Sequence, residues 1–270
     1  MDKIIITGTK GFIGSNLYQS LKDQYSIIEI NEDIFDFDYR EILQNIFFND
    51  EIKGVFHIGA CSDTLETNVN YMMLVNYEFT KLLSELCDAF AVPLIYSSSA
   101  ANYGENNIHP SNLYGWSKYV AEDSVIKRSG IALRYFNVYG PGEENKGRMS
   151  SVAYQMFIKN KNGEKPMLFP NNPRRDFVYV KDIISANLFA FENYTSLCGY
   201  YYDVGCGTAR SFEDVLDLMD IEYGYHHESL IPKGYQYYTC SMKDNWMKGW
   251  EPKYQLEDGI NDYLLYLNEY

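Results

Sequence analysis

The stretch KIIITGTKGFIG, residues 3–14, decides the fold of this chain. It begins with an apolar run that is typical of a buried strand, and a helical pattern follows it. Gly8, Gly11 and Gly14 lie at the junction, in a TGxxGxxG spacing. The first glycine allows a tight turn, the second lets the backbone approach a pyrophosphate, and the third lets the helix pack on the strand. Because a helix N-terminus also attracts anions, the stretch predicts the first strand–helix unit of a dinucleotide-binding fold.

Strands and helices alternate through the first half of the chain. Further apolar runs predict strands at residues 26–30, 55–57, 94–98 and 131–135, and helical spacing predicts helices at 39–48, 71–90 and 112–127. This alternation predicts βαβ units and therefore an α/β fold of the Rossmann type, with a doubly wound parallel sheet. Ligands of such sheets bind at the carboxyl ends of the strands.

The regular alternation breaks after Gly140. A polar loop, a helix around residues 149–159 and a stretch rich in Asn, Pro and Lys follow. Residues 177–180 and 200–204 are predicted to return to the sheet, and residues 256–267 to form an amphipathic helix. We therefore expect an NAD(P)-binding domain, residues 1–139 and about 176–204, and a smaller, interleaved C-terminal substrate-binding domain, residues 140–175 and about 205–270.

Composition excludes several classes of protein. The chain has 270 residues, 46% of them hydrophobic and 22% charged, which excludes wholesale disorder. Its net charge of −14 disfavours a binder of nucleic acid or of anionic membranes, and no stretch approaches the ~18 apolar residues of a membrane span. The first residues lack a secretory signal pattern, and the five cysteines are scattered without a CxxC pair. We expect a cytoplasmic location, no disulfide framework and no metal site.

Three Tyr–Lys pairs have the i, i+4 spacing that puts both side chains on one helix face: Tyr18/Lys22, Tyr77/Lys81 and Tyr114/Lys118. An ammonium group can lower the pKa of a nearby phenol and bind a ribose, which makes the tyrosine a usable base. Tyr114 follows the predicted strand that ends at Ser99, on the sheet edge where a nicotinamide would lie, whereas the other two pairs fit surface helix positions. A serine there can hydrogen-bond a substrate oxygen. We therefore expect Ser99, Tyr114 and Lys118 to form the catalytic triad.

These motifs resemble those of the extended short-chain dehydrogenases/reductases, a family that acts on nucleotide-activated sugars. The matching segments are TGTKGFIG (residues 7–14), SSSAANYG (97–104) and YGWSK (114–118). The dehydratase branch of that family carries an acidic pair directly after its catalytic hydroxyl residue. This chain has Ala100 and Ala101 there, so the dehydratase branch is disfavoured.

Longer motifs are similar to those of one branch, the ADP-glyceromanno-heptose 6-epimerases. They are GACSDT (59–64), YMM and NY (71–77), RYFNVYGP (134–141), NKG (145–147), RRDFVYVKD (174–182) and GYQYYT (234–239). The resemblance implies that NAD(P)⁺ takes a hydride from C6 of the heptose and returns it to the opposite face of the keto intermediate. Tyr114 then serves as one acid/base and Lys146 as the second, since lysine can fill that role when burial lowers its pKa. By its spacing alone, Lys146 also fits an exposed loop lysine.

The resemblance also implies the residues that contact the ligands. The cofactor contacts, besides Tyr114 and Lys118, are expected to be Gly8, Gly11, Phe12, Ile13, Gly14, Asn31, Asp33, Ile34, Gly59, Ala60, Asn76 and Val138. The substrate contacts are expected to be Ser99, Asn137, Arg148, Gln155, Phe169, Arg175 and Tyr235. Arg175 matches the contact to the nucleotide diphosphate, and a guanidinium group suits phosphate.

The chain departs from the family pattern at several of these positions. Asn31 stands where an Asp normally binds the ribose, so NAD and NADP both stay open as the tightly bound cofactor. Arg148 stands in place of a Ser, and Gln155 in place of a His. These departures bear on the exact sugar and on the cofactor phosphate more than on the class of reaction.

Two other functions stay open. A UDP-hexose 4-epimerase uses the same triad, but it rotates its keto-sugar in the pocket and needs no second base at Lys146. A non-catalytic binding module on the same fold is the other. In every case the expected partner is a nucleotide-diphosphate sugar, and the resemblance further implies a homo-oligomer.

Overall fold

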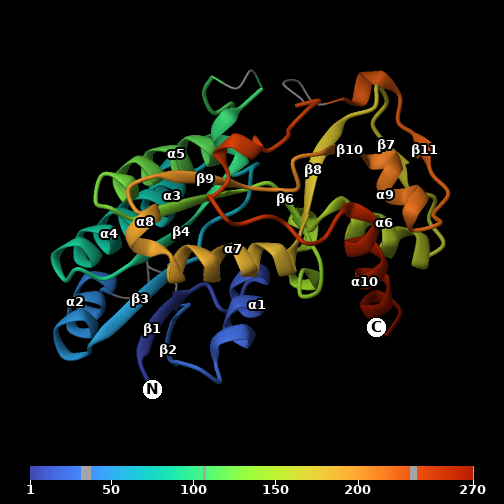
Figure 1. Ribbon diagram of the computed structural model, residues 1–270. Helices are drawn as coiled ribbons and strands as arrows, with labels where there is room; N and C mark the ends of the chain where they lie inside the picture. The colour runs from blue at the N-terminus through green and yellow to red at the C-terminus, as the bar shows by residue number, and fades with distance from the viewer. Residues whose placement is uncertain (32–37, 106–107, 232–235, 270) are drawn as a thin grey trace.

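A six-stranded parallel sheet forms the centre of the protein, in the strand order β2-β1-β3-β4-β5-β9 (Figure 1). The computed structural model describes residues 1–31, 38–105, 108–231 and 236–269. The central strands are β1 (Lys3–Thr7), β2 (Ser26–Ile30), β3 (Ile52–His57), β4 (Leu94–Ser99), β5 (Ile131–Tyr135) and β9 (Tyr201–Val204). The chain adds β2 on one side of β1 and then crosses to β3 on the other side. This confirms the predicted doubly wound sheet and puts its switch point between β1 and β3, where ligands of such folds bind.

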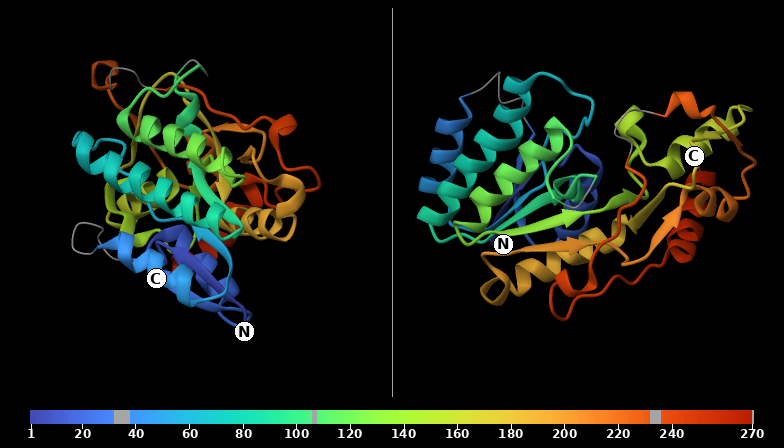
Figure 2. Two further views of the ribbon diagram at one scale, coloured as in Figure 1. Left: turned by 90° about the vertical axis from the view of Figure 1, so that its left-hand side faces the viewer. Right: turned by 90° about the horizontal axis from the view of Figure 1, so that it is seen from above.

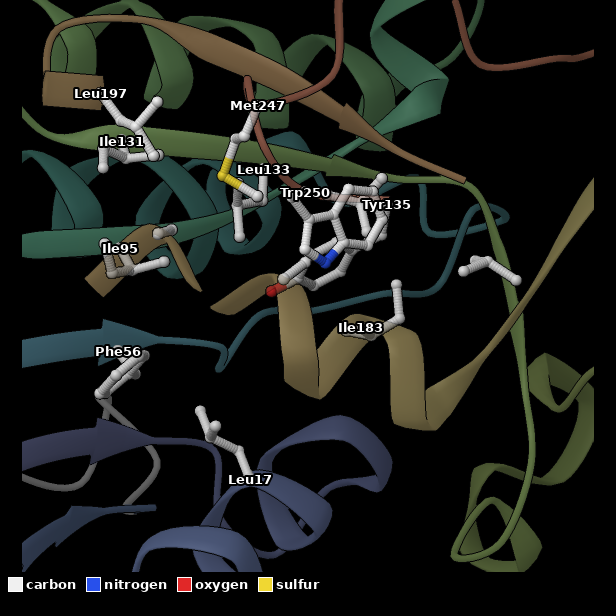
Figure 3. Close-up of a cluster of buried hydrophobic side chains, with 14 of the residues drawn as sticks. Leu17, Phe56, Ile95, Ile131, Leu133, Tyr135, Ile183, Leu197, Met247 and Trp250 are labelled. Carbon is white, nitrogen blue, oxygen red and sulfur yellow. The ribbon is translucent and has the colours of Figure 1, made fainter. Parts of the chain in front are cut away.

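Helices cover both faces of the central sheet. One face carries α1 (Phe12–Leu21) and α7 (Val180–Glu192), and the other carries α2 (Tyr39–Asn49), α4 (Phe79–Ala89) and α5 (Leu113–Ile126). Figure 3 shows the first face, where Leu17 of α1, Ile183 of α7 and Trp250 pack on the strands. Successive residues of β1 point to opposite faces, since Ile4 and Ile6 belong to this cluster and Ile5 to the other. A strand that is buried on both faces needs an unbroken apolar run, which is the pattern that predicted it.

The long helix predicted at residues 71–90 is one continuous helical segment, interrupted in its middle by a π-helical turn. It consists of α3 (Val69–Met73), a π-helical turn η1 (Leu74–Glu78) and α4. Asn76 lies in the π-helical turn and is buried. Such turns inside α-helices often occur at functional sites.

A smaller lobe lies beyond the carboxyl ends of the central strands (Figure 2). Its strands are β6 (Asn137–Tyr139), β8 (Arg174–Tyr179) and β10 (Ala209–Ser211), which form a three-stranded sheet, and β7 (Met167–Leu168) and β11 (Gly224–Tyr225), which pair with each other. Its helices are α6 (Val152–Lys161), α9 (Phe212–Leu218) and α10 (Leu256–Glu269). The remaining short helices of the protein are η2 (Ala100–Tyr103), η3 (Glu144–Met149), α8 (Tyr194–Leu197), η4 (Glu228–Leu230) and η5 (Lys243–Asn245).

The prediction that residues 177–180 return to the central sheet was wrong, because β8 pairs with β6 and β10 instead. Alternation along β8 explains its position. Phe177 and Tyr179 pack into the core of the smaller lobe, whereas Val178 packs into the core of the larger one. The strand therefore joins the two cores. The other predicted return, at residues 200–204, is confirmed by β9 at the sheet edge.

Among the described residues, no helix combines the length and the apolar character that crossing a membrane requires.

Candidate active site

A cavity of about 820 Å³ opens at the carboxyl ends of the central strands. Its wall on the sheet side comes from the loops after β1 and β3 and from the ends of β4 and β5. Its opposite wall comes from the smaller lobe, including residues 149–152 and Phe212. The volume lies in the usual range for small-molecule sites. Ser99, Tyr114, Lys118 and Lys146, the four predicted catalytic residues, all line this one cavity.

The glycine loop fits the pyrophosphate of a dinucleotide. Gly8 has a φ of +73°, and a Cβ atom there would lie 2.7 Å from the Cα of Gly59, so the loops after β1 and β3 meet closely. A Cβ on Gly14 would lie 2.0 Å from the carbonyl oxygen of Gly8, so α1 packs directly on the turn. Gly11 precedes α1 as its N-cap and lines the cavity. The three glycines thus leave an open cradle at a helix N-terminus, where an anionic group is favoured.

The side chain of Asn31 supports this glycine loop. Its Oδ1 accepts a hydrogen bond from the backbone N–H of Lys10 at 3.1 Å, and its Nδ2 donates to Thr9 Oγ1 at 2.6 Å. Asn31 and Lys10 both line the cavity. Asp33 and Ile34, the next predicted cofactor contacts, lie outside the described residues. The other predicted contacts that line the cavity are Phe12, Ile13, Gly59, Ala60 and Val138.

Ser99 and Tyr114 meet at the end of β4. Ser99 is the last residue of β4, and its Oγ accepts the N–H of Ala101 at 3.1 Å. Tyr114 lies in the first turn of α5, where Asn112 caps the helix by accepting the N–H of Gly115 at 2.8 Å. Burial raises the pKa of the Tyr114 phenol, and its hydrogen bond with Ser99 acts in the opposite direction. The expected lowering by Lys118 is therefore not the dominant effect on this phenol.

Lys118 lies one turn after Tyr114 on α5 and is only 2% exposed. Its ammonium group lies 4.3 Å from the centroid of the Tyr96 ring. Burial lowers the pKa of Lys118 to about 7, and the negative charge of Glu122 acts against this shift. The two other Tyr–Lys pairs do not line the cavity: Tyr18 and Lys22 lie at the end of α1, and Tyr77 and Lys81 lie in η1 and α4.

Lys146 faces the cavity from the smaller lobe. It lies in η3, and its Nζ is 5.4 Å from the centroid of the Phe12 ring beside the glycine loop. Burial lowers the pKa of Lys146, and the nearby Glu143 acts in the opposite direction. Glu143 is fully buried and accepts hydrogen bonds from Ser151 Oγ at 2.8 Å and from the hydroxyl of Tyr263 at 3.0 Å. Lys146 is thus a partly buried lysine in a braced loop, and a lysine with a lowered pKa can exchange protons near neutral pH.

Asn76 acts on the backbone around the site rather than on the cavity itself. Its side-chain oxygen accepts the N–H of Cys61 at 2.8 Å, and its Nδ2 donates to the carbonyl of Cys61 at 2.9 Å. The same Nδ2 lies 2.9 Å from Ser117 Oγ, on the helix that carries Tyr114 and Lys118. Asn76 does not line the cavity.

The two predicted arginine contacts lie outside the cavity lining. Arg148 is exposed and forms an ion pair with Asp63, which follows β3 on the other lobe. Arg175 is buried and donates hydrogen bonds to the carbonyl oxygens of Arg174, at 3.0 Å, and of Gln236. A diphosphate would therefore compete with existing partners at both guanidinium groups.

The remaining predicted substrate contacts do not all lie at the cavity. Asn137 lines it. Gln155 donates to the carbonyl of Ser150 at 2.7 Å, and Phe169 packs against His226 with ring centroids 5.4 Å apart; neither lines the cavity. Tyr235 lies outside the described residues.

Sequence reasoning missed a buried polar chain beneath the glycine loop. His57, at the end of β3, forms hydrogen bonds with Thr7 Oγ1 at 2.7 Å and with Thr80 Oγ1 at 2.8 Å. Burial lowers the pKa of His57 to about 3, so it stays neutral near pH 7. Thr7 Oγ1 also accepts the N–H of Gly59 at 2.9 Å, which fixes the two strand ends under the cavity. The sequence did carry a signal for this chain, because each of two apolar runs ends in a polar residue: Thr7 in β1 and His57 in β3.

Comparisons with known proteins agree with the resemblance seen in the motifs. Residues 4–205 match the model of the NAD dependent epimerase/dehydratase family. An ADP-L-glycero-D-manno-heptose-6-epimerase from Brachyspira hyodysenteriae is 32% identical over 310 aligned positions, which cover 96% of each chain.

Solved structures share the fold along the whole chain. The crystal structure of the Helicobacter pylori ADP-L-glycero-D-manno-heptose-6-epimerase matches with a TM-score of 0.83 and 26% identity, covering 100% of this chain and 97% of that one. A UDP-glucose 4-epimerase from Thermotoga maritima, solved with UDP-glucose, shares the fold with a TM-score of 0.85 at 24% identity, covering 99% of both chains. Taken with the family match and the glycine cradle, these findings confirm the predicted family: the chain belongs to the NAD dependent epimerase/dehydratase family.

Proposed function

We propose that this protein is an NAD(P)-dependent epimerase that converts ADP-D-glycero-D-manno-heptose into ADP-L-glycero-D-manno-heptose. One observation carries the proposal: Lys146, partly buried and with a lowered pKa, lines the same cavity as Tyr114 but comes from the opposite lobe. Inversion at C6 uses one acid/base on each face of the reacting carbon, whereas a 4-epimerase needs only one. The heptose epimerase relatives support the same substrate.

The proposed reaction uses four side chains of the cavity. When bound, NAD(P)⁺ supplies the hydride acceptor, and afterwards the same hydride as donor. Tyr114 accepts the proton of the C6 hydroxyl as C6 loses its hydride, which leaves a ketone, and Ser99 hydrogen-bonds the ketone oxygen. Lys118 holds the nicotinamide ribose. After the ketone reorients, Lys146 donates a proton to its oxygen as the hydride returns to the opposite face. One hydride and one proton leave and one of each returns, so the reaction has no net redox change.

The cofactor would lie on the glycine cradle at the switch point, held by the residues of both strand ends. We therefore assign residues 1–139 and about 176–204 to NAD(P) binding, and residues 140–175 and about 205–270 to substrate binding. In this assignment β8 belongs to both parts, since its side chains pack into both cores. The resemblance also predicts a homo-oligomer, which light scattering on the purified protein would check.

The substrate contacts follow from the same assignment. Ser99 and Asn137 already line the cavity. Arg148 would exchange its ion pair with Asp63 for a group of the substrate, and Arg175 would offer its guanidinium to the diphosphate. Gln155, Phe169 and Tyr235 complete the proposed set.

The test is NMR of ADP-D-glycero-D-manno-heptose incubated with the purified protein and no added cofactor. Growth of the L-glycero signals would support the substrate, the reaction and a retained dinucleotide together. Conversion of UDP-glucose alone, in a parallel tube, would replace the proposal with a 4-epimerase. No conversion in either tube, with NAD(P) released on denaturation, would replace it with a non-catalytic binding module.

A further inference from the structure

Glu122 lies on the same face of α5 as two of the proposed catalytic residues. Tyr114, Lys118 and Glu122 follow one another at intervals of four residues, so their side chains stack along the helix. Glu122 is only 3% exposed and does not line the cavity. A buried carboxylate is costly unless it is paired and hydrogen-bonded, so its partners decide what it does.

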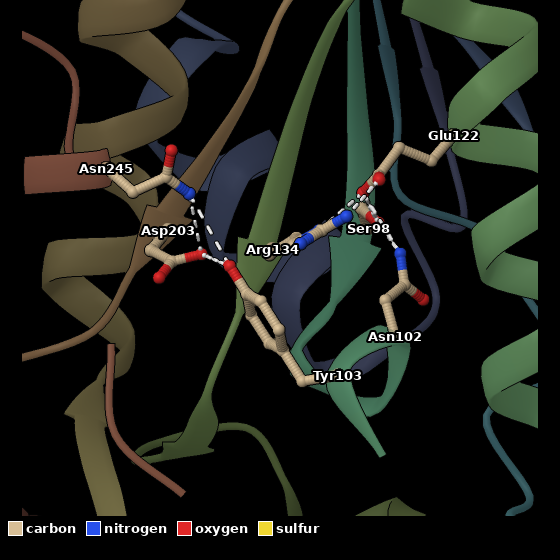
Figure 4. Close-up of polar contacts among 7 residues, drawn as sticks. All are labelled: Ser98, Asn102, Tyr103, Glu122, Arg134, Asp203 and Asn245. Atoms are coloured by element: carbon tan, nitrogen blue, oxygen red, sulfur yellow. Dashed lines mark hydrogen bonds and ion pairs between the residues drawn. The ribbon is translucent and has the colours of Figure 1, made fainter. Parts of the chain in front are cut away.

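The carboxylate of Glu122 binds Ser98 and Asn102 (Figure 4), which lie on either side of Ser99 in the sequence. Its Oε2 accepts hydrogen bonds from Ser98 Oγ at 2.5 Å and from Asn102 Nδ2 at 3.0 Å. Ser98 directly precedes Ser99 in β4, and Asn102 lies in η2, three residues after it. One carboxylate therefore ties the helix that carries Tyr114 to the strand end that carries Ser99.

Arg134 holds this carboxylate in place. Arg134 on β5 donates its Nε to Glu122 Oε2 at 2.9 Å and its Nη2 to Oε1 at 2.6 Å, a bidentate geometry. Its guanidinium carbon lies 4.6 Å from the ring centroid of Tyr103 and 3.6 Å from that of Tyr201. With these two rings and the double hydrogen bond, the ion pair has little freedom to move.

Charged and ionisable groups around Lys118 make Glu122 its main source of negative charge. His57 on β3 is neutral near pH 7, and Tyr96 on β4 offers its ring. Burial raises the pKa of Tyr114, which lies on the same helix. Glu122 is the neighbour that opposes the effect of burial on the pKa of Lys118.

We propose that Glu122 is a positioning residue of the active site, which fixes Ser99 relative to Tyr114 and places a carboxylate one helical turn after Lys118, the residue proposed to hold the ribose of the dinucleotide. The proposal rests on the roles assigned above to Ser99, Tyr114 and Lys118. Glu122 then has two separate effects. Through Ser98 and Asn102 it sets the position of Ser99, and through its negative charge it acts on the pKa of Lys118.

The test compares Glu122→Gln with the wild-type protein by NMR of ¹³Cε-labelled lysine and by titration with NAD. We expect the pKa of Lys118 to be about 7 in the wild-type protein and roughly one unit lower in the variant, because a nearby negative charge is lost. Since Lys118 carries its charge only below its pKa, NAD affinity should decline as the pH rises through that value. The decline should begin at lower pH in Glu122→Gln, with roughly threefold weaker binding midway between the two pKa values and a ratio that approaches about tenfold above both.

Two matched variants isolate the effects. Glu143→Gln removes a glutamate that is equally buried but braces the Lys146 loop, and it should leave the pKa of Lys118 unchanged. Ser98→Ala removes one donor to Glu122 and keeps its charge, so the Lys118 titration should stay while turnover falls through the displaced Ser99.

Glu122→Gln leaves Arg134 buried without its charged partner, which is strongly destabilising. If that variant does not fold, Glu122→Gln/Arg134→Met removes both charges and is measured in the same way. A folded variant with the wild-type Lys118 titration and wild-type NAD affinity at every pH would overturn the proposal. The Lys118 titration and the NAD affinity need no sugar substrate, so a failure of the proposed heptose reaction would leave these two measurements readable.

Discussion

The chemistry of the cavity depends first on how burial acts on a few single residues. Tyr114 is made a weaker acid by burial, and both lysines that face it are made weaker bases. Two substitutions test the roles of the side chains directly.

Tyr114→Phe removes the proposed base and leaves the ring in place. We expect turnover to fall by about 10²–10⁴-fold, since that is the usual contribution of a general acid/base, while the dinucleotide stays bound. Steady-state rates and the dinucleotide content of the purified variant check this. Tyr18→Phe is the matched control, because Tyr18 has a lysine at the same spacing but lies away from the cavity; equal losses in both variants would refute the role of Tyr114.

Lys146→Ala tests the second acid/base. Epimerisation of the heptose should fall by about 10²-fold or more, because one face of the reacting carbon then lacks its proton donor. Lys161→Ala, on an exposed lysine at the end of α6, should keep the wild-type rate. Wild-type epimerisation by Lys146→Ala would rule out the two-base reaction and favour the one-base chemistry of a 4-epimerase.

Motif spacing predicted Ser99, Tyr114 and Lys118, because it identifies positions that the backbone brings to one edge of a parallel sheet. Lys146 was predicted from the resemblance, since its spacing alone also fits an exposed loop lysine. All four residues line one cavity. Spacing carries no information about partners that are remote in the chain. It therefore missed the Arg148–Asp63 ion pair and the position of Glu122 behind Ser99, which depend on segments 85 and 24 residues apart.

At the level of elements, the glycine turn after β1 leaves no room for a Cβ atom at Gly8 or Gly14. Strands β1, β2 and β5 lie at the apolar runs that predicted them. The sequence could not show which sheet β8 joins. A strand whose two faces pack into two different cores has the same run of apolar residues as a strand buried inside one sheet. Strands as short as β7 and β11 offer too few residues for any period to be recognised.

Gly14→Ala tests the packing of α1 on this turn. The new Cβ would lie 2.0 Å from a backbone oxygen, so we expect about 1–3 kcal/mol lower stability and weaker NAD binding. Gly11→Ala is the comparison, because its Cβ would have 3.3 Å to the same oxygen and its φ of −86° suits alanine. That variant should unfold like the wild type and bind NAD more weakly. Equal thermal stability of Gly14→Ala and the wild type would contradict the close packing.

At the scale of the whole molecule, the two lobes are joined by buried polar groups as well as by β8. Asp176 on β8 is fully buried and accepts the backbone N–H groups of Cys206 at 2.7 Å, of Gly207 at 2.9 Å and of Ser241 at 2.9 Å. Gln236 Nε2 donates to the carbonyl of Gly104 at 2.7 Å, which connects the segment beside Arg175 to the loop after Ser99. The cavity between the lobes is therefore built from segments far apart in sequence.

Asp176→Asn should destabilise the protein by on the order of 2–3 kcal/mol. The NH₂ group of the asparagine would then face backbone N–H donors where a carboxylate oxygen of Asp176 accepts their hydrogen bonds. Urea unfolding checks this value. Asp262→Asn removes a half-exposed carboxylate on α10 that pairs with the exposed Lys181 of α7, and it should cost less than about 1 kcal/mol. Similar unfolding midpoints for the two variants would show that Asp176 does not hold the segments together.

The most direct test of the central claim follows a deuterium label at C6 of ADP-D-glycero-D-manno-heptose through the reaction in ordinary water. If the hydride is removed and returned within one cavity, the L-glycero product retains the deuterium at C6 with no cofactor added. Product that has lost the label to solvent, or an unchanged substrate, would contradict the account.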